Sequence, residues 1–164
     1  MATTITETLQ KHLTNVKTKV EQRMGDYGRN ASGRSVGSLT VSVNGAVGTL
    51  YGSSSFLVME KGRAGGKVPM NFVGIIKQWI IDKGLSVTPI PSTRKNAKYT
   101  PYERGLNSFA GAVAYSIMKH GTKLHRDNGY NDIFTTAVNE ELKAMNDELI
   151  LYTAKSIADI NNLL

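Results

Sequence analysis

The last 35 residues of the sequence, 130–164, contain neither glycine nor proline. Both residue types interrupt helices, so their absence over this stretch favours one continuous helix. Apolar side chains recur within it at steps of four, three, four and three, at Val138, Leu142, Met145, Leu149 and Tyr152. The pattern predicts a helix over residues 131–162, and about 30 helical residues would span about 45 Å. Because that length exceeds what a chain of 164 residues needs for its own core, we expect part of this helix to contact another subunit.

The other helices are predicted from apolar spacing and from residues at their ends. Residues 4–24 have an apolar side chain every three or four positions, and Thr4 with Glu7 has the form of a capping box. A short apolar run at residues 56–59 fits a short helix or a third strand, and we favour a helix over residues 53–61. The same rules predict two further helices, over residues 71–83 and 108–120.

Residues 39–51 predict a β-hairpin. Leu39, Val41 and Val43 alternate with polar residues, and Asn44-Gly45 is a preferred pair for a two-residue type I′ turn. This register would place Leu50 and Ala46 on the face that Leu39 and Val43 share. Since one face would be apolar, a helix should cover it. The predicted fold class is therefore α+β, with a small antiparallel sheet built on this hairpin and packed against several helices in a single domain, residues 1–164.

Two stretches lack a helix or strand pattern. Residues 28–37 are rich in glycine and serine, and we expect them to be mobile unless something binds them. Residues 85–105 contain three of the four prolines and a basic cluster, and a loop of this length is unusual in a compact domain. We predict that this second stretch is a docking loop, ordered mainly by contact with another chain.

The net charge of +7 is unevenly distributed. Residues 61–126 contain 12 basic and two acidic side chains, whereas residues 127–164 contain two basic and seven acidic ones. Segments of opposite charge suit contact between neighbouring copies, or pairing within one chain. The candidate partner-contacting residues are therefore the charged and aromatic side chains of these segments: Arg94, Lys95, Lys98, Tyr99, Tyr102, Arg104, Lys123, Glu140, Glu141, Asp147 and Glu148.

The sequence contains no pattern that indicates catalysis or metal binding. It has no cysteine, and its histidines, His12, His120 and His125, include no pair at the i, i+4 spacing that would present two rings to a metal ion. Residues 62–67 resemble a phosphate-binding loop, but Lys61 and Val68 replace the glycine and the hydroxyl residue that such a loop needs. We predict a protein that is not an enzyme and needs no cofactor or metal. No apolar run reaches the length of a membrane helix, so we expect no membrane contact.

Nucleic-acid binding is an alternative that the sequence leaves open. Tyr99 and Tyr102 are interleaved with the basic residues Arg94, Lys95, Lys98 and Arg104, which combines positive charge with rings that can stack on bases. Against this, no helix is rich in arginine and asparagine in the manner of a recognition helix. The alternative function is a basic DNA-binding accessory protein of a phage or bacterium.

Short motifs connect the predicted elements to a known family. The apolar run before residue 60 ends in Glu60-Lys61-Gly62, a later helix ends in Gly121-Thr122-Lys123, and Phe134 leads into the last helix. In this order the chain resembles the tail-completion or head–tail joining proteins of tailed bacteriophages, which include small neck and minor tail proteins. The resemblance covers roughly residues 5–150. It departs from the family at Lys61, where an aromatic residue is usual, and in the greater length of the last helix.

The resemblance implies an α+β fold without catalysis and a homo-oligomeric ring at the head–tail junction, through which DNA passes without sequence-specific binding. It implies a structural protein of the virion that is assembled in the host cytoplasm. The implied partners are further copies of the chain and other connector, tail-terminator or tail-tube proteins. The residues that match the family motifs are Glu60, Gly62, Gly121, Thr122, Lys123 and Phe134.

Overall fold

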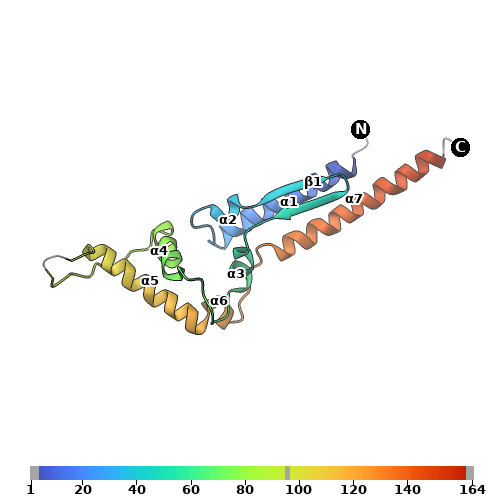
Figure 1. Ribbon diagram of the computed structural model, residues 1–164. Helices are drawn as coiled ribbons and strands as arrows, with labels where there is room; N and C mark the ends of the chain where they lie inside the picture. The colour runs from blue at the N-terminus through green and yellow to red at the C-terminus, as the bar shows by residue number, and fades with distance from the viewer. Residues whose placement is uncertain (1–3, 95–96, 162–164) are drawn as a thin grey trace. The chain divides into compact units, whose positions relative to one another are not determined.

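The computed structural model describes residues 4–94 and 97–161, and its fold is α+β (Figure 1). The sequence predicts one domain, and within the chain the contacts define two compact units. Unit 1 consists of Met1–Glu60 and Asn131–Leu164, and unit 2 consists of Lys61–Tyr130. Each unit is described by itself.

Unit 1 combines two long helices with the hairpin. Its elements are α1 (Ile5–Asp26), α2 (Arg34–Gly37), β1 (Thr40–Asn44), β2 (Val47–Tyr51), α3 (Ser55–Lys61) and α7 (Thr135–Asn161). Helix α1 packs against both α7 and the hairpin, as Figure 1 shows. The core of unit 1 is formed by buried apolar side chains of α1, α3, α7 and the segments before β1 and α7, namely Val16, Val20, Met24, Leu39, Phe56, Ile133 and Ala137.

The bounds of the two long helices differ slightly from the prediction. Thr4 and Glu7 form the predicted capping box, but α1 continues past Gly25 and ends at Asp26. Helix α7 begins at Thr135 instead of residue 131, because the Glu60 carboxylate accepts hydrogen bonds from the amides of Phe134 and Thr135 and so fixes the start of the helix. The predicted end at residue 162 lies outside the described residues.

The hairpin is confirmed, and its turn lies one residue further along than predicted. Val41 pairs with Leu50 and Asn44 pairs with Val47, so Gly45 and Ala46 form the turn. Gly45 has a φ of 59°, and this positive φ at the first turn position is typical of a type II′ turn. Leu50 lies on the predicted face, since a shift of two residues in register preserves the alternation of side chains. Ala46 does not, because it is part of the turn.

The glycine- and serine-rich stretch 28–37 includes the short helix α2. The Ser38 hydroxyl donates to the carbonyl of Ser35 (2.6 Å) and accepts from the amide of Ser53 (3.0 Å). Val36 packs against the core of unit 1. The stretch is therefore held by polar contacts that the sequence pattern did not indicate.

Unit 2 is built on an antiparallel pair of helices. Its elements are α4 (Phe72–Asp82), α5 (Pro101–His120) and α6 (Lys123–Arg126). The core lies between α4 and α5 and consists of the buried side chains of Ile76, Ile80, Leu106, Ala110 and Ala114. Helix α4 matches the prediction of residues 71–83 to within one residue at each end.

The predicted docking loop over residues 85–105 is too long, and the predicted helix start near residue 108 is wrong. Helix α5 begins at Pro101, where Thr100 and Glu103 form a second capping box and proline occupies the first helical position. The amide of Ile90 donates to the carbonyl of Pro101 (2.9 Å), and Val87 packs against the core of unit 2. The residues before position 91 are thus ordered by contacts within unit 2, and residues 91–94 and 97–100 are the described part of the remaining loop.

Candidate interaction surfaces

The acidic side chains of α7 pair with basic side chains of α1. Glu141 Oε2 lies 2.8 Å from His12 Nδ1, and Glu141 Oε1 lies 2.8 Å from Lys19 Nζ. Glu148 Oε2 lies 3.1 Å from His12 Nε2 and 2.6 Å from Lys11 Nζ. Both ring nitrogens of His12 therefore contact carboxylates, and the imidazole side chain is buried between α1 and α7.

These contacts change the acidity of two carboxyl groups. Burial by itself raises the pKa of Glu141, but hydrogen bonds from Lys19, His12 and Asn15 outweigh it and lower the pKa to about 2. For Glu148, the hydrogen bonds from Lys11 and then His12 lower the pKa. Both groups are consequently carboxylates at neutral pH, and they connect the two helices of unit 1.

Three of the four acidic residues predicted to meet another copy are thus engaged within the chain. Glu140 is exposed but also accepts from Lys19 Nζ (3.1 Å), and Asp147 is exposed as well. The sequence had left open pairing between copies or within one chain, and the structure places these three glutamates in contacts within unit 1.

Glu60, one of the residues that match the family motifs, anchors the start of α7. Its side chain is fully buried, and its Oε1 accepts from the amides of Thr135 (3.0 Å) and Phe134 (3.4 Å). Its carbonyl accepts from the amide of Asn131 (2.8 Å). A carboxylate at this position also interacts favourably with the positive end of the helix dipole.

Three other motif residues, Gly62, Gly121 and Thr122, lie where two segments of unit 2 pack closely. The amide of Arg63 donates to Thr122 Oγ1, and the amide of Thr122 donates to the carbonyl of Arg63, both at 2.9 Å. A Cβ atom at Gly121 would lie 2.6 Å from the carbonyl oxygen of Arg63, and one at Gly62 would lie 2.6 Å from the amide of His125. Both glycines also have positive φ, so side chains are excluded at each position by space and by backbone conformation. Lys123 is exposed at the start of α6.

The basic candidates are dispersed over the loop and the start of α5. Arg94 and Lys98 are exposed, and Lys98 Nζ lies 5.4 Å from the centre of the Tyr99 ring. Tyr99 and Tyr102 are exposed, and Arg104 is half-buried. Lys95 lies outside the described residues. Among the described candidates of this group, the structure therefore brings Lys98 close to the Tyr99 ring.

The α4–α5 pair has an exposed apolar surface that sequence reasoning missed. Lys77 Nζ donates to Asn107 Oδ1 (2.9 Å), which identifies one side of the pair. An α-helix turns about 100° per residue, so side chains two positions apart lie about 160° from each other around the helix axis. Ile75 and Trp79 are two positions from Lys77 in α4, and Phe109 is two positions from Asn107 in α5. Ile75, Trp79, Tyr102 and Phe109 hence share the opposite side, and we call these four residues the aromatic face. Their exposed fractions are 41–50%.

A second exposed apolar surface lies near the end of α7. Ile150, Ile157 and Ile160 are 65%, 55% and 59% exposed, and together with Thr153 they recur at steps of three, four and three. We call these four residues the terminal stripe. The prediction that part of the last helix exceeds what the core needs agrees with this exposure, because Ala137 and Glu141 are the only buried residues of α7.

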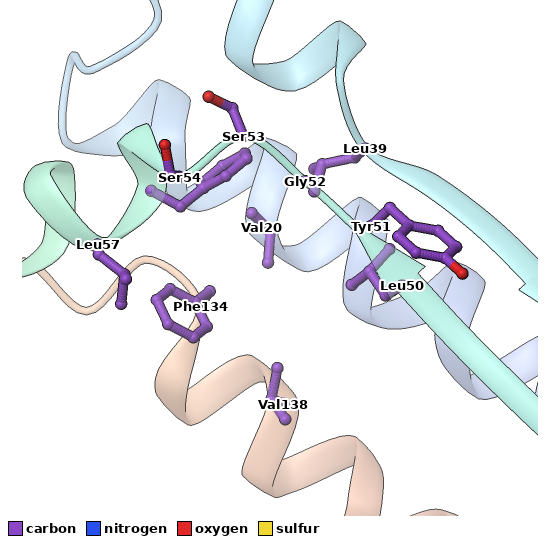
Figure 2. Close-up of a pocket in the computed structure, with 11 residues that line it drawn as sticks. Val20, Leu39, Leu50, Tyr51, Gly52, Ser53, Ser54, Leu57, Phe134 and Val138 are labelled. Carbon is purple, nitrogen blue, oxygen red and sulfur yellow. The ribbon is translucent and has the colours of Figure 1, made fainter.

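Unit 1 also contains an apolar pocket of about 340 Å³ (Figure 2). Figure 2 shows the side chains of Phe134, which precedes α7, of Val138 from α7 and of Leu57 from α3 around this space. The other lining residues are mainly apolar and include no charged side chain: Val20, Leu39, Leu50, Tyr51, Gly52, Ser53, Ser54 and Phe56. Such a lining can bind an apolar group by van der Waals contact.

Within residues 4–94 and 97–161, no group of three or more histidine, aspartate or glutamate side chains is placed to hold a metal ion. No helix in the same part of the chain is long and apolar enough to cross a membrane. In comparisons with known proteins, the chain matches no family model, no curated protein and no solved structure.

Proposed function

We propose that this chain is a structural subunit of a tailed-bacteriophage particle, a tail-completion or neck protein that assembles as a ring at the head–tail junction. The observation that carries the proposal is the presence of two separate exposed apolar surfaces, the aromatic face and the terminal stripe. Large exposed apolar patches mark interaction sites, because water-exposed apolar area is costly to leave uncovered.

Two different surfaces on one chain support a ring in particular. A contact between identical surfaces closes at a dimer, whereas a contact between unlike surfaces continues from copy to copy and gives a ring when the rotation between copies closes. The further partners in this proposal are other connector, tail-terminator or tail-tube proteins, with DNA passing through the ring and with assembly in the host cytoplasm.

The motif residues are consistent with a structural role. Glu60 fixes the start of α7, and Gly62, Gly121 and Thr122 allow two backbone segments to meet in unit 2. All of these roles concern how the chain folds, so the resemblance that the motifs supply is a resemblance in architecture.

The test measures the mass of the assembled protein and its presence in particles. Native mass spectrometry of the purified chain should give one ring mass, and purified phage particles should contain the chain at a fixed copy number. A chain that stays monomeric at every concentration and is missing from purified particles would contradict the proposal.

DNA binding is a second candidate. It is favoured by the exposed side chain of Arg94 and by the exposed Lys98, whose Nζ lies near the Tyr99 ring. A protein that neutralises several phosphates loses DNA affinity steeply as salt increases. Titration of duplex DNA at several salt concentrations therefore separates the two candidates, because a steep slope together with monomeric protein would favour the DNA-binding function.

A further inference from the structure

We propose that the terminal stripe of one copy packs against the aromatic face of the next copy. The inference rests on the proposed ring and names the contact that builds it. The occupant of the aromatic face is thus a second copy of this chain, through residues 150–160 of its last helix.

Among the described residues of unit 1, the end of α7 extends beyond the helix α1 that packs against it. Thr8 of α1 contacts Glu148 of α7 (3.5 Å), and the two helices run antiparallel, as the pairs formed by His12 with Glu141 and by Arg23 with Asp132 show. Because α1 begins only three residues before Thr8, α7 beyond about residue 152 extends past the described part of α1 (Figure 1). At 1.5 Å per residue, the extension to Asn161 is about 14 Å long.

The spacing of the terminal stripe suits packing against other helices. Steps of three, four and three place Ile150, Thr153, Ile157 and Ile160 on one side of α7, which is the pattern of anchors that a helix uses when it docks on a helical surface. The aromatic face is such a surface, since Ile75 and Trp79 come from α4 and Tyr102 and Phe109 come from the adjacent α5. A third helix laid across it would form a three-helix layer.

The charges of the two units favour contact between unlike units. Residues 61–130, which form unit 2, contain 12 basic and three acidic side chains, a net charge of +9. The rest of the chain contains eight basic and ten acidic side chains, a net charge of −2. Two copies of unit 2 would therefore repel each other, whereas unit 2 of one copy attracts unit 1 of another.

The two apolar surfaces can be joined without burying a charged side chain. Neither the four residues of the aromatic face nor the four of the terminal stripe includes an ionisable group other than the Tyr102 hydroxyl. An apolar centre surrounded by charges of opposite sign is the usual composition of a specific interface.

The test uses one variant for each surface. Ile157→Asp places a charge in the terminal stripe, and Trp79→Glu places one in the aromatic face. Both side chains are exposed, so we expect circular dichroism and the melting temperature to stay close to those of the unmodified chain. Self-association should weaken by at least about tenfold in each variant. The matched controls are Leu151→Asp and Tyr115→Glu, which change exposed apolar residues outside the two surfaces and should leave self-association unchanged.

Mixing the two variants identifies which surfaces meet. The Ile157→Asp chain keeps its aromatic face and the Trp79→Glu chain keeps its terminal stripe, so native mass spectrometry of the mixture should show a one-to-one heterodimer that neither variant forms alone. Stripe-to-stripe or face-to-face contact would give no such heterodimer. Its absence, with each variant still folded, would overturn the proposed contact.

Disulfide cross-linking provides a second measurement, because the chain has no cysteine of its own. Chains with Ile157→Cys should cross-link to differently tagged chains with Trp79→Cys faster than Leu151→Cys chains cross-link to Tyr115→Cys chains. The proposed contact would be overturned if both the Ile157→Asp and the Trp79→Glu chains still formed the ring and if the Ile157→Cys and Trp79→Cys chains cross-linked no faster than the control pair. The proposed function would then still stand. An unmodified chain that never assembles would contradict both.

Discussion

At the scale of single residues, Glu141 is the side chain whose charge contributes most clearly to stability. Its pKa in the folded chain is about 2, below the ordinary value of 4.5. Because the folded pKa is the lower one, the stabilisation is fully present above about pH 4.5 and is lost as the pH falls towards 2. We expect Glu141→Gln to lower the free energy of unfolding by up to about 3 kcal/mol at neutral pH and by much less near pH 2.

Urea unfolding at a series of pH values measures this difference. Asp147→Asn is the matched control, since Asp147 is an exposed acidic residue on the same helix, and its effect should be small at every pH. If Glu141→Gln lowered the free energy of unfolding equally at pH 7 and pH 2, the stabilisation could not be assigned to the charged carboxylate.

Glu60 offers a second prediction at this scale. Its Oε1 accepts from two amides at the start of α7, and the whole side chain is buried. Glu60→Ala removes the acceptor and leaves both amides without it, so we expect a loss of about 1–3 kcal/mol in the free energy of unfolding. Glu60→Gln keeps an acceptor oxygen and should lose less. If both substitutions lowered the free energy of unfolding equally, the hydrogen bonds to Glu60 Oε1 would not be what stabilises the start of α7.

At the scale of elements, some boundaries were readable from the sequence and others were not. Alternation from Leu39 to Val43 predicted the first strand, because one buried face imposes a period of two, and Asn44-Gly45 predicted the turn that makes it a hairpin. The start of α5 was missed although Thr100, Pro101 and Glu103 form a recognisable helix start. Its first buried apolar side chain comes only at Leu106, so the apolar spacing on which the prediction relied begins too late.

The interaction surfaces depend on how elements pack, which sequence patterns do not report. Glu141 and His12 are 129 residues apart and meet only because α1 and α7 run antiparallel in a specific register. The aromatic face likewise depends on which sides of α4 and α5 are turned towards each other. Only the packing shows that Ile76 and Ile80 fill the core while Trp79 stays partly exposed.

The loop between α4 and α5 provides the prediction at the scale of elements. Ile90 and Pro101 are joined by a backbone hydrogen bond of 2.9 Å, so both ends of the loop are already held together in unit 2. Deletion of residues 92–98 should therefore leave the melting temperature within a few degrees of that of the full chain, because exposed loops contribute little to stability.

The same deletion should reduce incorporation into particles if this loop docks on another chain. The control replaces residues 92–98 with seven glycine and serine residues, which keeps the loop length and removes its charges. An unfolded deletion variant, or normal incorporation of both variants, would contradict the docking function of the loop.

At the scale of the whole molecule, unit 2 is an insertion into unit 1. Unit 1 is made of two separate segments of chain, and unit 2 is the continuous segment between them. The carbonyl of Glu60 and the amide of Asn131 are 2.8 Å apart, so the two ends of the insertion meet at one point of unit 1. Insertions whose ends lie close together are tolerated because the host structure is not interrupted.

This arrangement predicts that unit 1 folds without unit 2. Replacing Lys61–Tyr130 with a short glycine–serine linker keeps the core around Val20 and Met24 and the ion pairs between α1 and α7. We expect a cooperative thermal transition and dispersed amide resonances in an NMR spectrum. Since the aromatic face is removed with unit 2, native mass spectrometry should find a monomer. The matched control introduces Glu60→Ala into the shortened chain, which should lower its melting temperature by removing the cap of α7. A shortened chain that is unfolded, while the full chain is folded, would show that unit 1 depends on unit 2 for its stability.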